Sequence, residues 1–259
     1  MATKNYKNKY VFLGDSNSIN IEIICKSFKR LKHKVSYIII CNKIDLKTYL
    51  SKIKSKLKIN EIFNPLDFNE CKSDYLNIFN IENISRHKYK NLLNQIKIAN
   101  ELSNTNKLDL ITMPINKSIF KKNNLKFNGL TEYFGKINKK KTIMAMIGNK
   151  FSVIPYTTHI NPKDIHLSLN RKKLNSFLNI LLILIKQKKY KLKFKNINFL
   201  CYNPHCGEDT TLGKEDYLIS NILSKFKEIS GPYPADSVFQ NIKNNSLFIS
   251  TYHDQSLVP

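Results

Sequence analysis

Residues 10–41 read YVFLGDSNSINIEIICKSFKRLKHKVSYIIIC, and this stretch decides the fold class. Its two ends, residues 10–13 and 35–41, are short runs rich in β-branched and aromatic residues, which are typical of buried strands. Between them, residues 19–31 carry apolar side chains at helical spacing. A strand, a helix and a second strand in this order predict a parallel βαβ unit.

The same alternation continues to the end of the chain. Further strands are expected at residues 108–113, 142–148, 151–156, 197–202 and 246–251, and further helices at 44–57, after an N-cap at Ser85, at 174–185 and at 215–226. Gly148 and Asn149 mark a turn between two of these strands. The helix at 174–185 is apolar on nearly all sides, so we expect it to lie in the interior. The pattern predicts an α/β fold with largely parallel sheets.

The charge of the chain is strongly positive. Its 43 lysines and arginines against 19 acidic residues give a formal net charge of +24, which makes a nucleic-acid-binding protein one hypothesis. The lysines are scattered along the whole chain, however, and only Arg30, Arg86 and Arg171 are arginines. Readers of nucleic acid usually concentrate charge and favour arginine, so we interpret the lysines as compositional drift and expect no nucleic-acid partner.

The cysteines and the hydropathy of the chain indicate in which cellular compartment the protein works. The five cysteines are widely spaced and form no C-x-x-C motif, and the first ten residues are polar and basic. The longest apolar run, residues 177–185, is much shorter than the roughly 20 residues that cross a bilayer. We therefore expect a protein of the reducing cytoplasm with no membrane partner.

Three histidines share one setting. His159, His205 and His253 each follow the end of an expected strand, where open α/β sheets gather their ligands. Glu208 and Asp254 stand close to two of them. Each histidine alone could be an ordinary loop residue, but together they suggest one divalent-metal site with positions left open for substrate.

Seven segments, in order from the start of the chain to its end, together resemble the 4-hydroxythreonine-4-phosphate dehydrogenase family of vitamin B6 synthesis. They are GDSNSINIEI (14–23), MPINK (113–117), FNGLTEYFG (127–135), TTH (157–159), NPHCGED (203–209), GPYPADSVF (231–239) and YHDQSLVP (252–259). The resemblance implies a fold like those of isocitrate and isopropylmalate dehydrogenases, with two α/β domains, placed here at residues 1–118 and 119–259. It also implies a homodimer whose active site lies at the subunit interface.

The family's reaction is the NAD- or NADP-dependent oxidation and decarboxylation of 4-phosphohydroxy-L-threonine, a step toward pyridoxal 5'-phosphate. The resemblance implies a divalent metal (zinc, magnesium or cobalt) bound by His159, His205 and His253, and a substrate contact from Thr131. Lys117, Asp236 and Asp254 are candidates for groups that orient substrate or ligands. Lys117 and Asp236 could equally be a surface charge or a helix cap.

The chain departs from the family pattern in three places. Leu130 replaces a histidine beside Thr131, and the family's glycines and proline in the first loop are replaced at Ser16, Ser18, Asn20 and Ile21. The family also continues past YHDQ into a segment with further substrate contacts. We expect the 259 residues alone to bind metal but to reduce NAD slowly or not at all. There are two alternatives to this function. The same fold could act on another phosphorylated hydroxy acid, or the chain could be a truncated, inactive remnant of the enzyme.

Overall fold

The computed structural model describes residues 8–31, 33–121, 123–124, 129–187, 190, 192–240 and 242–258. The chain divides into two compact units, Met1–Gly129 and Leu130–Pro259. This division falls later in the chain than residue 118, where the sequence places the domain boundary. Phe127 and Asn128, which begin one of the family-like motifs, lie outside the described residues.

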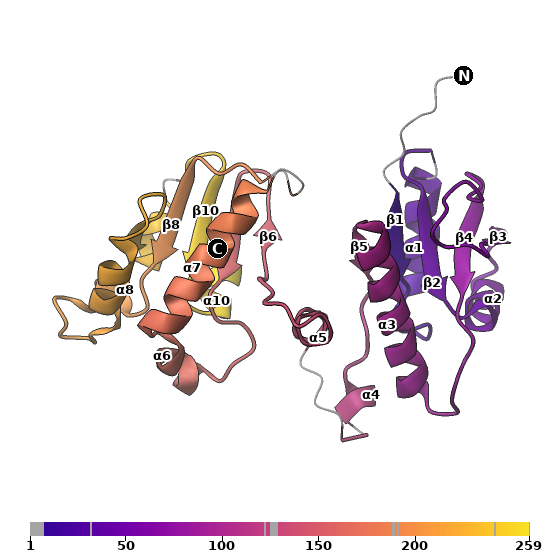
Figure 1. Cartoon of the computed structure of the whole chain (residues 1–259), viewed down its shortest axis with the longest axis horizontal. Coiled ribbons are helices and arrows are strands. Elements are labelled where there is room, and N and C mark those ends of the chain that lie inside the picture. The colour runs from indigo at the N-terminus through magenta and orange to yellow at the C-terminus, as the bar shows by residue number, and fades with distance from the viewer. Residues whose placement is uncertain are drawn as a thin grey trace. The chain divides into compact units, whose positions relative to one another are not determined.

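The first unit is built on a five-stranded sheet in the order β3-β4-β2-β1-β5, in which every neighbouring pair is parallel. Its strands are β1 (Lys9–Phe12), β2 (Tyr37–Cys41), β3 (Lys58–Glu61), β4 (Tyr75–Asn80) and β5 (Leu110–Thr112). Its helices are α1 (Asn20–Leu31), α2 (Lys43–Lys52), α3 (Lys88–Asn106) and α4 (Ser118–Lys121) (Figure 1). The βαβ unit predicted from residues 10–41 is confirmed by β1, α1 and β2.

The helices of this unit cover both faces of its sheet. Apolar residues of α1 and α2 form one core with Val11, Ile39 and Ile78 of the strands. Successive side chains of a strand point to opposite faces, so Tyr10 and Phe12 turn toward the other face, where α3 contacts β1, β2 and β5. Burial on both faces explains why these strands are near-continuous apolar runs.

The turn from β1 into α1 depends on Gly14, whose φ is +74°. A Cβ atom at this position would stand 2.4 Å from the carbonyl oxygen of Pro114. The buried Asn20 fixes the same turn, because its Nδ2 donates to the carbonyls of Leu13 (2.9 Å) and Pro114 (2.7 Å). The glycine and the amide together anchor the first loop to the end of β5.

The second unit carries its own five-stranded sheet in the order β6-β7-β10-β8-β9. Its strands are β6 (Met146–Ile147), β7 (Phe151–Pro155), β8 (Asn196–Leu200), β9 (Ser230–Tyr233) and β10 (Ser246–Ser250). Only β6 is antiparallel to its neighbour, across the turn predicted at Gly148 and Asn149. The α/β class with two largely parallel sheets is thus confirmed.

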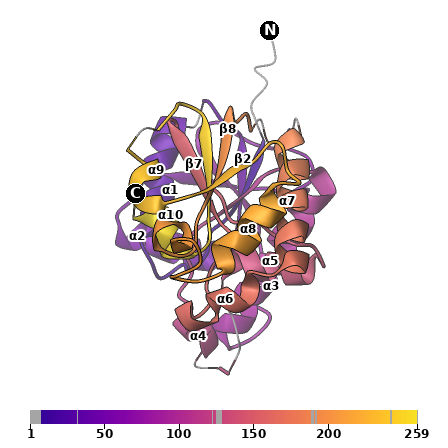
Figure 2. The same cartoon turned by 90° about the vertical axis from the view of Figure 1, so that its left-hand side faces the viewer.

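The helices of the second unit include two long ones that lie side by side on its sheet, α7 and α8 (Figures 1 and 2). The helical segments are α5 (Leu130–Ile137), η1 (Pro162–Asp164), α6 (Ile165–Ser168), α7 (Arg171–Lys186), η3 (Pro204–Gly207), α8 (Glu215–Leu223), α9 (Ala235–Val238) and α10 (His253–Leu257). Side chains of α7, α8 and the strands, among them Leu178, Phe199, Ile219 and Leu247, form its main core. No helix in the described ranges is long and apolar enough to cross a membrane.

Two expectations from the sequence are wrong. The helix at 174–185 is not interior on nearly all sides: Leu178 is fully buried, but Ile183 is 59% exposed, because only one side of α7 faces the sheet and α8. Ser85 is not the N-cap of the following helix. His87 holds that position without a side-chain cap bond, and Ser85 Oγ instead accepts from the backbone N–H of His87 at 3.2 Å.

The orientation of α7 yields a stability prediction. Leu178→Ala should lower the free energy of unfolding by about 2–5 kcal/mol, because it opens a cavity in the core. Ile183→Ala, on the exposed side of the same helix, should change it by less than about 0.5 kcal/mol. Urea unfolding of both variants tests this, and similar losses would show that both sides of α7 are packed.

Candidate functional site

The three histidines singled out in the sequence follow three neighbouring strands of the second sheet. His159 follows β7, His253 follows β10 and His205 follows β8, and these strands lie in the order β7-β10-β8. The two neighbouring pairs are parallel, so their carboxyl ends meet at one edge of the sheet. The prediction that each histidine stands just beyond a strand is confirmed.

His159 and His253 lie together, with ring centroids 5.5 Å apart. Each ring turns its Nδ1 toward a carboxylate: His159 toward Glu132 Oε1 at 3.3 Å, and His253 toward Asp254 Oδ1 at 3.0 Å. With Nδ1 carrying the proton that faces the carboxylate, Nε2 of each ring keeps its lone pair. Histidines that bind metals are usually held in this way.

Glu132 joins this cluster, although the sequence did not single it out. It lies on α5, and its Oε1 also faces the Thr158 hydroxyl at 3.5 Å. Its Oε2 is buried and has no hydrogen-bond partner within the described residues. A buried, unpaired carboxylate oxygen is costly, and such atoms are kept mainly where a function needs them. The available signal was its place directly after Thr131, as the only acid in that motif.

The two histidine loops are bonded directly to each other. Thr157 donates from its backbone N–H (3.2 Å) and from Oγ1 (2.7 Å) to the carbonyl of Thr251. Gln255 closes the arrangement, since its Oε1 accepts from the N–H of Thr251 at 2.9 Å and its Nε2 donates to the carbonyl of Cys201 at 2.8 Å. The glutamine of the YHDQ motif therefore ties the ends of β10 and β8 together.

His205 lies apart from this pair. It is exposed, on η3, where His205 (φ 49°) and Cys206 (φ 58°) both adopt the left-handed backbone conformation. Such strain at consecutive non-glycine residues occurs mostly at functional sites. In the part of the chain that the structure describes, no group of three or more His, Cys, Asp or Glu side chains could hold a metal ion. One chain therefore brings together two of the three predicted ligands.

Asp216 fixes the loop that carries His205. This carboxylate on α8 is only 2% exposed. Its Oδ1 accepts from the N–H of Tyr202 at 2.6 Å, and its Oδ2 accepts from the N–H of Asn203 at 2.9 Å. Two backbone donors to one carboxylate stabilise the charge without a cation.

Cys206 lies in the same loop as His205, and the charge of Asp236 acts on its thiol. Burial raises the pKa of the Cys206 thiol to about 12, with contributions from Cys201, Asp216 and Asp236. The thiol of the metal-free protein therefore stays protonated at neutral pH. Asp236 itself is exposed, in the first turn of α9.

The remaining predicted residues lie on two different units. Leu130 and Thr131 begin α5, directly before Glu132. Lys117 belongs to the first unit, directly before α4. The placement of Thr131 beside the Glu132–His159 pair agrees with a substrate contact, and that role stays a prediction.

The second unit contains a cavity of about 560 Å³. Glu132 and Thr158 line it, whereas His159 and His253 do not. Lys140, Lys141 and Lys173 line it as well, so an anionic group could be held there.

Parallel α/β sheets with polar side chains gathered beyond their strand ends are typical of α/β enzymes. A family model described as "Pyridoxal phosphate biosynthetic protein PdxA" matches residues 22–259. The chain belongs to this family. It is thereby an oxidoreductase of pyridoxal phosphate biosynthesis, and the resemblance seen in the sequence is confirmed.

Similar proteins agree with this assignment. The 4-hydroxythreonine-4-phosphate dehydrogenase of Hydrogenobaculum sp. (strain Y04AAS1) is 30% identical over 254 residues, which span 96% of this chain and 81% of that protein. The protein of the same name from Aquifex aeolicus (strain VF5) is 30% identical over 265 residues, with the same two coverages.

Solved structures show the same fold. The 4-hydroxythreonine-4-phosphate dehydrogenase of Klebsiella pneumoniae superposes with a TM-score of 0.79 at 20% identity, over 98% of this chain and 83% of that one. The protein of the same name from Burkholderia phymatum gives a TM-score of 0.73 at 20% identity, over 98% and 82%.

The Asp216 clamp gives a prediction for the His205 loop. Asp216→Asn places an amide NH2 against a backbone N–H and removes the charge, so the free energy of unfolding should fall by about 1.5–3 kcal/mol. Asp209→Asn, at an exposed position in the same loop region, is the control and should leave it unchanged. Chemical denaturation measures both, and an unaffected Asp216→Asn protein would show that the clamp does not hold the loop.

Proposed function

We propose that this protein oxidises the secondary alcohol of 4-phosphohydroxy-L-threonine with NAD (or NADP) and then releases the carboxylate as carbon dioxide. Family membership and the names of its relatives support this reaction. The observation that carries the proposal is the pair of adjacent imidazoles, His159 and His253, each with its Nδ1 against a carboxylate.

The donor chemistry of the pair fits a divalent cation such as zinc, cobalt or magnesium. Two imidazole nitrogens remain available, and an unpaired buried carboxylate oxygen of Glu132 lies on the residue that orients one of them. Such a cation would supply Lewis-acid activation of the alcohol oxygen, and NAD would supply the hydride acceptor. His159 and His253 would hold the cation, while Glu132 and Asp254 keep the rings oriented.

The chain's own residues also favour a phosphorylated substrate. Lys140, Lys141 and Lys173 offer cations to a phosphate group in the cavity that Glu132 lines, and Thr131 lies at the start of α5 to contact the rest of the substrate. The phosphate would orient the reacting carbon through binding energy from a part of the molecule that does not react.

We also propose that the protein works as a homodimer, in which each metal site takes ligands from both chains. His159 and His253 are adjacent within one chain, and no group of three ligands forms among the described residues, so we assign the third imidazole, His205, to a second copy. A two-fold dimer then contains two equivalent shared sites. We also place the protein in the cytoplasm, since all five cysteines are free thiols.

A second candidate keeps the chemistry and changes the substrate to another phosphorylated hydroxy acid. Leu130 favours it, because this partly exposed apolar side chain next to Thr131 cannot form a hydrogen bond with substrate.

The shared metal site can be tested by mixing variants. His159→Ala and His205→Ala should each abolish tight Co²⁺ binding. Unfolded and refolded together, they should recover about a quarter of wild-type binding, because half of the dimers are mixed and each mixed dimer has one intact site.

The control mixes His159→Ala with His253→Ala, which remove ligands from the same chain and should recover nothing. No recovery in either mixture would mean that the three histidines do not form one site shared between chains. Recovery in both would mean that His253 is also donated across the interface.

The reaction can be tested in a single turnover, with enzyme in excess over substrate so that slow chemistry is still detected. Metal-loaded protein with NAD and 4-phosphohydroxythreonine should form NADH and carbon dioxide in equal amounts. His253→Ala should lower the rate at least about 10²-fold, whereas His87→Ala, at an exposed helix start in the other unit, should not. Faster oxidation of another phosphorylated hydroxy acid would favour the second candidate, and no NADH from any of them would contradict both.

A further inference from the structure

Two of the five free cysteines, Cys201 and Cys206, lie together in the second unit, and we call them the thiol pair. Their thiols are hydrogen-bonded to each other. Both also contact the same part of β9. The backbone N–H of Cys201 donates to the carbonyl of Tyr233 at 2.9 Å. Sγ of Cys206 lies 3.5 Å from the carbonyl oxygen of Pro232. The reaction proposed above uses neither sulfur.

Cys201 is the rigid member of the thiol pair. It directly follows β8 and is only 2% exposed. Its carbonyl accepts from Nε2 of Gln255 at 2.8 Å, and its thiol donates to the carbonyl of Asn203 at 3.0 Å. The backbone N–H groups of Cys206 and Ala235 donate to its sulfur. Because such donors stabilise negative charge on a sulfur, this cysteine is suited to serve as a thiolate ligand.

Cys206 is the accessible member of the thiol pair. Its side chain is half-buried, and it lies within six consecutive residues, 205–210, that all have a positive φ. Five of the six are not glycine, and such residues adopt this conformation singly rather than in runs. A strained segment of this kind is easily displaced. An ion can therefore enter on the Cys206 side and draw that sulfur toward Cys201.

The surroundings of the thiol pair favour a positive ion. The carboxylates of Asp216 and Asp236 act on the Cys206 thiol through their negative charge. The carbonyl oxygens of Asn203 and Pro232 lie against the two sulfurs. Burial raises the pKa of both thiols, so each carries its proton in the metal-free protein. A metal ion displaces such protons, because a thiol that coordinates a metal is deprotonated.

The number of ligands decides which ion fits the thiol pair. Within the described ranges, no third His, Cys, Asp or Glu side chain joins it in a group that could hold a metal. Zinc takes four protein ligands in structural sites and three in catalytic ones, so two sulfurs leave it incomplete. Thiolates are soft ligands that select Cu⁺, and this ion is stable with one sulfur on either side.

We propose that the thiol pair binds one soft monovalent cation, Cu⁺ or its analogue Ag⁺, between the sulfurs of Cys201 and Cys206. The ion forms one bond to each sulfur, and the two thiol protons pass to solvent, so neither an oxidant nor a reductant takes part. The site is additional to the proposed reaction and does not depend on it.

A competition titration measures the binding. Under anaerobic conditions, Cu⁺ is distributed between the protein and a chromogenic Cu⁺ chelator, and the bound ion is counted per chain. One Cu⁺ per chain should bind, and an excess of Zn²⁺ should not displace it. Failure of the protein to take Cu⁺ from the chelator, or displacement of the ion by Zn²⁺, would overturn the proposal.

Matched variants locate the ion. Cys201→Ser and Cys206→Ser should each weaken Cu⁺ binding at least about 10²-fold, since each removes one of only two soft ligands. Cys71→Ser is the control and should bind Cu⁺ as the wild type does, because Cys71 is also half-buried but its sulfur is bonded to Ser36. Equal losses in all three variants would show that Cu⁺ binds the thiols without preference and would contradict the site. Circular dichroism of each variant confirms that it is folded.

X-ray absorption of the Cu⁺-loaded wild-type protein identifies the ligands without any substitution. We expect two sulfur neighbours and no nitrogen. A third neighbour, whether a sulfur or an imidazole nitrogen such as that of His205, would contradict the two-coordinate site. His253→Ala should bind Cu⁺ with wild-type affinity, so a failure of this site and a failure of the proposed reaction are distinguishable.

Discussion

The candidate metal site depends on the hydrogen bonds that continue the β7–β10 ladder beyond the ends of its strands. The backbone N–H of Tyr156 donates to Ser250 at 2.7 Å, and Thr157 then donates twice to Thr251. Both threonines are buried, at 6% and 0% exposure, so these bonds are shielded from water. They fix how far apart the chain can place the two residues that follow, His159 and His253. Without them each histidine would lie on an independent loop.

The sequence could predict features that arise from local pattern. Runs such as residues 35–41 and 246–251 identify buried strands, and a parallel sheet then brings their ends to one edge whatever the loops contain. Glu132 was not predictable in this way, because its importance comes from a tertiary contact with His159, 27 positions away. Strand β3 (Lys58–Glu61) was missed because its residues KINE are polar for a strand: it is the edge strand of its sheet and is only partly buried.

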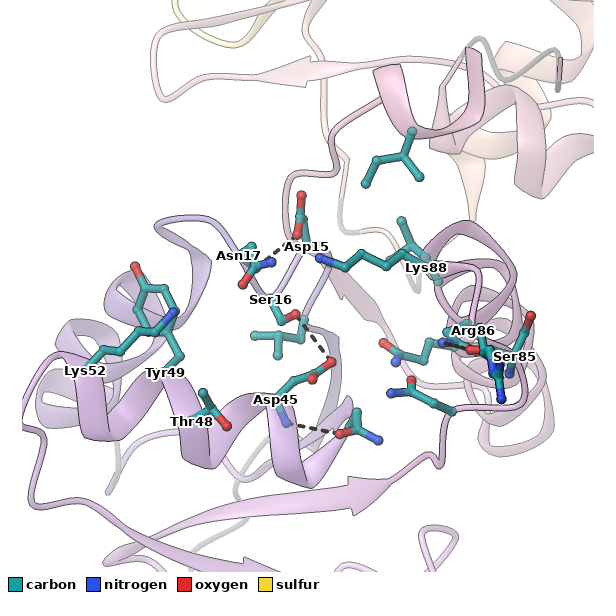
Figure 3. Close-up of a pocket in the computed structure, with 18 residues that line it drawn as sticks. Asp15, Ser16, Asn17, Asp45, Thr48, Tyr49, Lys52, Ser85, Arg86 and Lys88 are labelled. Carbon is teal, nitrogen blue, oxygen red and sulfur yellow. Dashed lines mark hydrogen bonds between the residues drawn. The ribbon is translucent and has the colours of Figure 1, made fainter. Parts of the chain in front are cut away.

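The two units use the same architecture for different chemistry. In the second, polar residues follow three strands in succession, and their loops are bonded to one another, which brings imidazoles and carboxylates together. In the first, neighbouring loops diverge to opposite faces, and the space between them is a cavity lined by amides and charges of both signs (Figure 3). The family motifs identify the former, because they are strings of particular side chains. The latter combines one family motif, the loop at residues 14–17, with side chains of α2 and α3 that only the path of the chain brings to it.

The separation of His205 from the other two histidines has a thermodynamic consequence on the proposed arrangement. A cation that needs ligands from both copies binds the dimer and not the isolated chain, so binding and assembly are linked and each strengthens the other. The repulsion between two chains of net charge +24 opposes dimerisation. Cations in the shared sites add further positive charge, and ligand bonds and carboxylates close to the rings offset part of it. Glu132 and Asp254 are placed to provide this offset, which gives these acids an electrostatic role beyond orienting the imidazoles.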